Sequence, residues 1–96
     1  MDSSSSHTRL TARVTGRVQG VYFRAFTRNQ ARLLGINGWV RNEYDGSVSL
    51  EAEGPRETLE RLLVAVGRGP SGARVDHVAT DWSDATGAYD GFAIRF

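Results

Sequence analysis

The sequence contains no cysteine, and this absence excludes several kinds of chemistry. Without cysteine, the chain of 96 residues can form no disulfide, carry no thiolate nucleophile and offer no sulfur ligand to zinc. The stability of the fold must therefore come from packing alone. Nothing in the composition marks the chain as secreted.

Long apolar runs are also missing. No stretch approaches the roughly 18 consecutive apolar residues of a membrane-spanning helix. The opening residues, MDSSSSH, lack the basic and apolar regions of a signal peptide. We therefore expect residues 1–8 to form a disordered tail, residues 9–96 to form one domain, and the protein to be cytoplasmic without membrane association.

Lysine is the third absence. All twelve basic residues are arginine, so a charged side chain that binds phosphate must be a guanidinium. Compositional bias is the simpler explanation of the missing lysine. The formal net charge is only +1, which gives no electrostatic reason to expect nucleic acid as a partner.

The residues that are present alternate between two hydrophobic periods. A period of two predicts strands, and repeats of three and four residues predict helices. The expected strands cover about 10–15, 36–42, 47–53, 74–82 and 89–96, and the expected helices cover about 22–34 and 55–66. The Asp45-Gly46 pair predicts a hairpin turn between the second and third strands.

These periods also predict which side chains face the core. Ser49, Glu51 and Glu53 of the third strand are expected to face solvent. Gly35 is expected to end the first helix. The side chains expected to face inward include Phe23, Phe26, Gln30 and Leu33 or Leu34 in the first helix, Leu59, Leu62, Leu63 and Val66 in the second helix, and Phe92, Ile94 and Phe96 in the last strand.

The order of elements predicts an α+β fold. Strand-helix-strand crossovers are right-handed, so both helices should lie on the same face of the sheet. The expected architecture is a ferredoxin-like βαββαβ sandwich, with an antiparallel sheet of four strands plus a short C-terminal fifth.

The segment from Gly16 to Arg24 joins the first strand to the first helix. Its glycines permit turns whose backbone N–H groups converge on an anion, and the helix that follows directs its positive end to the same place. Arg24 adds a guanidinium suited to phosphate oxygens. The residues also fit an ordinary loop followed by a solvated helix face of Arg24, Arg28 and Arg32.

A second candidate is Asn42, where the second strand leaves the sheet. Its carboxamide can hold a water molecule with one atom and a reacting oxygen with the other. The same residue also fits the start of an Asx-type turn.

Together the two segments match a known pattern. Gly-Arg-Val-Gln-Gly-Val-Tyr-Phe-Arg at 16–24 resembles the first signature of the acylphosphatase family, and Gly-Trp-Val-Arg-Asn at 38–42 resembles the second. The spacing between them also agrees, and the resemblance spans about residues 9–96. The resemblance implies an enzyme that hydrolyses acyl phosphates to carboxylate and inorganic phosphate.

The resemblance also implies roles for individual residues. Arg24 would bind the phosphate oxygens, Asn42 would position the attacking water, and Thr27 would support the asparagine or be a plain helix hydroxyl. The backbone N–H groups expected to hold the phosphate are those of Gln19, Gly20, Val21, Tyr22, Phe23 and Arg24. Inorganic phosphate or sulfate would compete for this site.

No cofactor or metal is expected. The two histidines, His7 and His77, are remote in sequence from both segments, and no histidine or carboxylate cluster has metal-ligand spacing. Because the chain ends at Phe96, we expect a free-standing enzyme, and because the enzyme is so small, we expect a monomer. The alternatives are a carbamoyl-phosphate module, as fused to hydrogenase-maturation carbamoyltransferases, and an RNA-binding module.

Overall fold

Residues 7–96, the part of the chain that this computed structural model describes, form five strands and two helices. The predicted tail over 1–8 lies outside the described residues except for His7 and Thr8, which already belong to the first strand. The elements are β1 (His7–Arg17), α1 (Phe23–Leu33), β2 (Asn37–Asn42), β3 (Val48–Pro55), α2 (Arg56–Arg68), β4 (Arg74–Asp84) and β5 (Phe92–Arg95).

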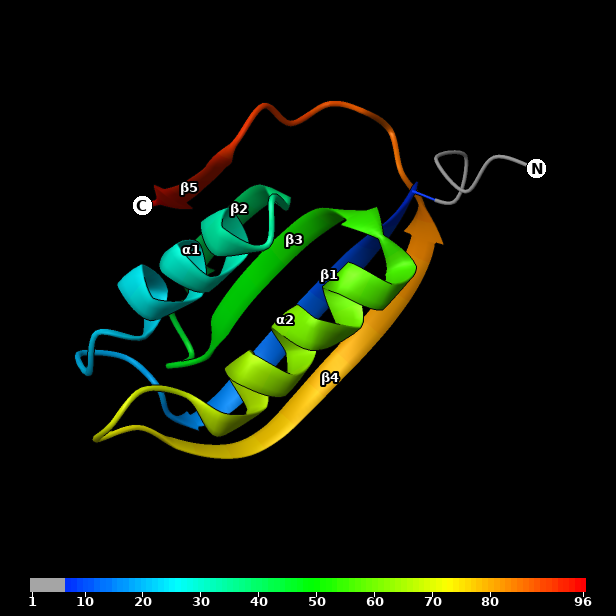
Figure 1. Cartoon of the computed structure of the whole chain (residues 1–96). Helices are drawn as coiled ribbons and strands as arrows, with labels where there is room; N and C mark the ends of the chain where they lie inside the picture. Colours follow the sequence, from blue (N-terminus) through cyan, green and yellow to red (C-terminus); the bar gives the residue numbers. More distant parts are fainter. Residues whose placement is uncertain (1–6) are drawn as a thin grey trace.

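The strands form one sheet in the order β4-β1-β3-β2-β5. Neighbours among the first four strands are antiparallel, as predicted, but β5 pairs parallel with β2. Figure 1 shows why: the segment between β4 and β5 crosses from one edge of the sheet to the other. The chain reverses direction once between β4 and β5. Because β2 runs opposite to β4, β5 then runs in the same direction as β2.

Both helices cover the same face of the sheet (Figure 1), which confirms the ferredoxin-like prediction. Alternate residues of the central strands fill the space beneath them, and Leu10, Val14, Val40 and Leu50 are all at most 1% exposed. The expected apolar stripe of α2 is confirmed, because its buried residues are Leu59, Leu62 and Val66.

The stripe predicted for α1 is partly wrong. Phe23, Thr27 and Ala31 are the buried residues, at a spacing of four, whereas Leu33 is 81% exposed. The small side chains of Thr27 and Ala31 lie on the buried face of α1, which packs against β2, β5 and α2. Leu33, in the last turn, lies on the opposite, exposed face. The prediction that Gly35 ends this helix is confirmed.

The end of α1 is a Schellman motif. Gly35 has a φ of 71°, and its N–H donates to the carbonyl of Arg32 at 3.2 Å. The N–H of Ile36 donates to the carbonyl of Ala31 at 2.9 Å. These two bonds satisfy helix-end carbonyls and turn the chain directly into β2.

Two other burial predictions are wrong. Phe96, expected to face inward, is 98% exposed because β5 ends one residue earlier. Glu53, expected to face solvent, is only 6% exposed. The crossing segment covers it, and the backbone N–H groups of Thr86 and Gly87 each donate to its carboxylate at 2.9 Å.

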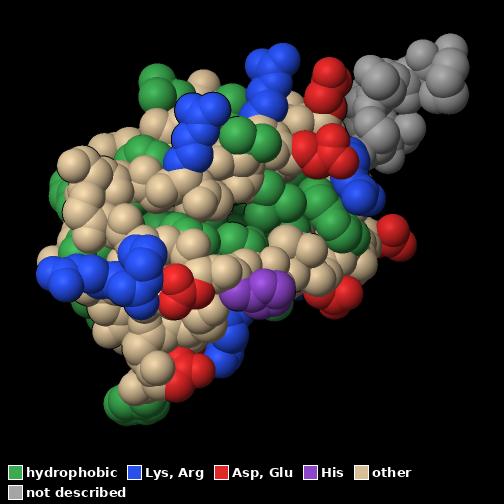
Figure 2. Space-filling model, turned by 90° about the horizontal axis from the view of Figure 1, so that it is seen from below, with side chains coloured by type: hydrophobic (Ala, Val, Ile, Leu, Met, Phe, Trp, Pro, Cys, Tyr) green, Lys and Arg blue, Asp and Glu red, His purple; other side chains and the backbone are tan. Residues whose placement is uncertain are grey.

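The edge formed by β4 exposes part of the core. Figure 2 looks at the molecule from below and shows a band of hydrophobic side chains between charged ones. Val75, Val78 and Trp82 of β4 and Leu63 of α2 are only partly buried against the core. No helix within residues 7–96 is long and apolar enough to cross a membrane.

Candidate active site

The loop between β1 and α1 is anchored at both ends. A bulge between Thr15 and Gly16 interrupts the pairing of β1 with β4. Gly16 has a φ of 129°, and a Cβ there would lie 2.1 Å from the carbonyl oxygen of Arg74, so only glycine fits. Val18 is 1% exposed and fastens the start of the loop to the core.

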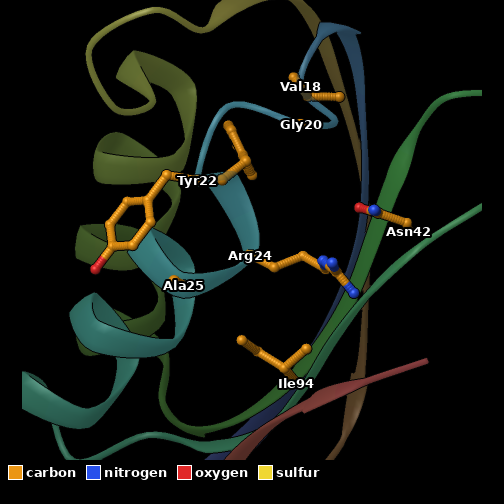
Figure 3. A pocket seen from close by; sticks show the side chains of 8 residues that line it. Val18, Gly20, Tyr22, Arg24, Ala25, Asn42 and Ile94 are labelled. Atoms are coloured by element: carbon orange, nitrogen blue, oxygen red, sulfur yellow. The ribbon is translucent and has the colours of Figure 1, made fainter.

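The loop turns through two left-handed residues. Gly20 has a φ of 73° and Tyr22 a φ of 69°, and Tyr22 is the one non-glycine with positive φ between residues 7 and 96. Such a conformation is uncommon for a residue with a bulky side chain and often marks a functional segment. The side chain of Tyr22 is 64% exposed and points away from the cavity in Figure 3.

This geometry leaves a run of backbone donors free. The first helical bond of α1 joins the N–H of Phe26 to the carbonyl of Tyr22 at 3.0 Å, and no side chain caps the helix. The N–H groups of residues 19–22 form no turn, cap or side-chain hydrogen bond within the described part of the chain. The first turn of α1 also holds no acidic residue, so its positive end is available to an anion.

Arg24 lies in that first turn, and its side chain extends toward the strand that carries Asn42 (Figure 3). The guanidinium carbon lies 5.0 Å from the centre of the Phe96 ring. This contact joins the last residue of the chain to the first turn of α1. Sequence patterns did not predict this contact, because Phe96 was expected inside the core.

Asn42 is the last residue of β2 and faces the same cavity as Arg24. Its Oδ1 atom is buried and has no hydrogen-bond partner among the described residues. The cavity has a volume of about 230 Å³, and Arg24 is its one charged lining side chain. The residues that line it are Val18, Gly20, Tyr22, Phe23, Arg24, Ala25, Asn42 and Ile94.

The structure therefore brings the predicted groups together from two distant segments. The loop, Arg24 and Asn42 meet at one cavity, although 17 residues separate the two side chains in sequence. The predicted supporting residue Thr27 is fully buried in α1, and its Oγ1 has no hydrogen-bond partner within residues 7–96. A wider hollow of about 550 Å³ adjoins Asn42 and is lined also by Arg41, Glu43, Tyr44 and Phe96.

The carboxylate closest to Asn42 in sequence is Glu43, and its surroundings favour the ionised form. A hydrogen bond from the Ser49 hydroxyl and the ion pair with Arg41 at 3.2 Å hold the pKa of Glu43 below its ordinary value. An ionised carboxylate cannot donate a proton, so Glu43 is poorly suited to act as a general acid at neutral pH.

The remaining candidate chemistry lies elsewhere. His77 is exposed on β4, which β1 and β3 separate from β2. Within residues 7–96, no three histidine or carboxylate side chains are grouped closely enough to hold a metal ion. The site thus consists of backbone donors, one guanidinium and one carboxamide.

The fold and this site define a ferredoxin-like domain that can hold a small anion between a helix start and an arginine. Residues 10–94 match the acylphosphatase family. An acylphosphatase from Salinibacter ruber is 62% identical over 91% of this chain and 92% of its own length. One from Pelotomaculum thermopropionicum is 49% identical, covering 86% of this chain and 90% of its own length.

Solved structures agree with the sequence relatives. The crystal structure of acylphosphatase from Bacillus subtilis superposes with a TM-score of 0.90 at 34% identity, covering 93% of this chain and 99% of that one. The chain belongs to the acylphosphatase family. It is accordingly an enzyme that hydrolyses the bond between carboxyl and phosphate in small acyl phosphates.

A larger protein contains a similar domain. The structure of full-length HypF in its phosphate- and nucleotide-bound form has a TM-score of 0.86 and 25% identity over 94% of this chain, but only 12% of that protein is covered. The likeness to HypF is therefore confined to one small part of it.

Proposed function

We propose that the enzyme binds the phosphoryl group of an acyl phosphate between Arg24 and the backbone N–H groups of residues 19–24. The observation that carries this proposal is that one cavity is lined by part of the loop, by Arg24 and by Asn42, whose Oδ1 has no partner within residues 7–96. The loop N–H groups at 19–22 also have no partner among the described residues and are available to an anion. Donors fixed by the fold before substrate arrives stabilise the charge that develops on the equatorial phosphoryl oxygens.

Asn42 is the proposed holder of the attacking water. Its Oδ1 accepts a hydrogen bond from the water and so aims the water oxygen at phosphorus, opposite the departing carboxylate. As the new P–O bond forms, the bond from phosphorus to the acyl oxygen breaks and the carboxylate leaves. A phosphate oxygen takes the proton of the water, and no side-chain base is needed.

Thr27 is the proposed support for this arrangement from within α1. Its buried hydroxyl needs a partner, since an unsatisfied buried hydroxyl costs about 1–3 kcal/mol. We further propose that the enzyme acts as a cytoplasmic monomer, and that inorganic phosphate or sulfate competes with substrate for the loop.

Hydrolysis of benzoyl phosphate and acetyl phosphate by the purified chain tests the proposed mechanism. We expect turnover that an excess of chelator leaves unchanged and that phosphate inhibits competitively. Arg28→Ala, one turn beyond Arg24 on α1, is the matched control and should retain this activity. Loss of activity on chelation, or non-competitive inhibition by phosphate, would contradict the proposal.

A further inference from the structure

The side chain of Gln19 makes contacts that the proposed reaction does not use. It is half-buried, and its Nε2 donates to the backbone carbonyl of Glu43 at 2.8 Å and to that of Ser47 at 2.9 Å. Both acceptors belong to the turn between β2 and β3. One side-chain amide therefore ties the loop after β1 to the turn that follows Asn42.

The turn is held together without Gln19. The N–H of Glu43 donates to the carbonyl of Ser47 at 2.8 Å. The Oδ1 of Asp45 accepts the N–H of Ser47 at 2.9 Å and its hydroxyl at 2.6 Å. Removing the Gln19 amide should therefore leave the turn folded and release it only from the loop.

Asn42 lies where the attached turn begins. It directly precedes Glu43, and the pairing of β2 with β5 ends one residue earlier, at Arg41. On its other side the backbone pairs with Val48 of β3. Because its Oδ1 has no partner within residues 7–96, the backbone at the start of the turn sets where the amide points.

We propose that the Gln19 side chain is a positioning residue that fixes the distance between the two halves of the site. One half is the loop with Arg24, and the other is Asn42 with the water it holds. This inference rests on the proposed function, because the two halves matter only if both act on one phosphoryl group. An error of about 1 Å between such groups can lower the rate by as much as about a hundredfold.

Gln19→Met tests the proposal, since methionine keeps the length of the side chain and lacks both amide hydrogens. We expect kcat for benzoyl phosphate to fall roughly tenfold to a hundredfold. The inhibition constant of phosphate should change less than about threefold, because the loop and Arg24 remain. Gln30→Met, at a half-buried position of α1, is the matched control and should leave both constants unchanged.

The Asn42→Ala background decides whether Gln19 acts through Asn42. There Gln19→Met should lower kcat less than about twofold, since the group it positions is gone. An equal loss of kcat in both backgrounds would overturn the proposal. A rise in the inhibition constant of phosphate as large as the fall in kcat would overturn it too, and would make Gln19 a phosphate-binding residue.

A structural readout separates this inference from the proposed function. In the phosphate-bound enzyme, the side-chain amide NMR signal of Asn42 should shift or broaden in Gln19→Met and not in Gln30→Met. An unchanged signal overturns the positioning role whatever the activity. If the signal moves while Asn42→Ala retains full kcat, the positioning role stands and the proposed water-holding role of Asn42 fails.

Discussion

The charge at the candidate site comes from a single side chain. Arg24 is the one charged residue that lines the smaller cavity, and its neighbours there are residues of the loop, apolar side chains and the carboxamide of Asn42. Donors held in place in this way stabilise developing charge more than mobile solvent can. We therefore expect the arginine to contribute more to the proposed reaction than an isolated surface charge would.

Replacing Arg24 with alanine should lower both phosphate binding and turnover. The loss of a charge-assisted donor group is expected to cost on the order of 3 kcal/mol, or about a hundredfold in kcat/KM. Arg24→Lys should recover little, because an ammonium cannot donate two parallel hydrogen bonds. Steady-state kinetics with benzoyl phosphate measure both variants. Near-normal rates in Arg24→Ala would remove Arg24 from the mechanism, and near-normal rates in Arg24→Lys would show that one positive charge suffices there.

Asn42→Ala should separate turnover from binding. The phosphate half of the site remains, so inhibition by phosphate should be nearly unchanged while kcat falls by roughly a hundredfold. Thr27→Val, which removes the buried hydroxyl at almost constant shape, should lower kcat less. If Asn42→Ala weakened phosphate binding as much as turnover, the carboxamide would be a phosphate ligand.

At the scale of elements, the active loop depends on the bulge that precedes it. Gly16 lies where β1 leaves its register with β4, and its backbone almost touches that of Arg74. The loop begins two residues later. Strand pairing therefore helps to fix the position of the N–H groups that are proposed to bind phosphate, together with the loop sequence.

Gly16→Ala should be strongly destabilising. The positive φ and the clash with the Arg74 carbonyl together should lower the free energy of unfolding by about 2–4 kcal/mol. Gly87→Ala is the matched control, because Gly87 has a φ of 72° with open space around its Cα. Urea unfolding of both variants measures the difference, and equal losses would show that close approach contributes nothing at Gly16.

The prediction of the elements succeeded wherever a local pattern decided the structure. The Schellman end of α1 at Gly35 and the stripe of α2 follow from residues close in sequence. The stripe predicted for α1 was only partly right, because Phe23 is buried and Leu34 packs against the core but Leu33 is exposed. In the folded protein, the small side chains of Thr27 and Ala31 are buried instead.

At the scale of the whole molecule, Glu53 joins the end of β3 to the segment that crosses the sheet. Burial alone would raise its pKa, but the N–H of Thr86, the Arg9 guanidinium at 2.8 Å and the N–H of Gly87 outweigh this effect. The pKa of Glu53 is lowered from 4.5 to about 2. The ionised carboxylate thus holds in place the segment that connects β4 to β5.

This pKa predicts how stability varies with pH. Since the folded pKa lies below the unfolded one, Glu53 stabilises the fold above about pH 4.5, and that stability is lost as the pH falls toward about 2. At pH 7 the free energy of unfolding of the wild type should exceed that of Glu53→Gln by on the order of 2 kcal/mol. This difference should shrink as the pH falls from about 4.5 toward about 2. Denaturant unfolding of both proteins at several pH values checks the trend; a gap independent of pH would contradict it.

The sequence by itself determined the architecture, the family and the identity of the proposed catalytic residues. These follow from hydrophobic period, from turn residues and from two short motifs, all of which are local properties of the chain. The motifs implied that Arg24 and Asn42 act at one site. The structure shows that both side chains line the same cavity.

Only the tertiary structure decided which distant groups support that cavity. Three such contacts join residues that are 24 to 72 positions apart in sequence. The amide of Gln19 binds the turn after β2, the ring of Phe96 lies against Arg24, and the backbone of Thr86 donates to the buried carboxylate of Glu53. No periodic pattern records such pairs, because each depends on how the strands align and where β5 enters the sheet. The physical reason is that side-chain contacts between distant segments form only after the backbone has fixed their distance.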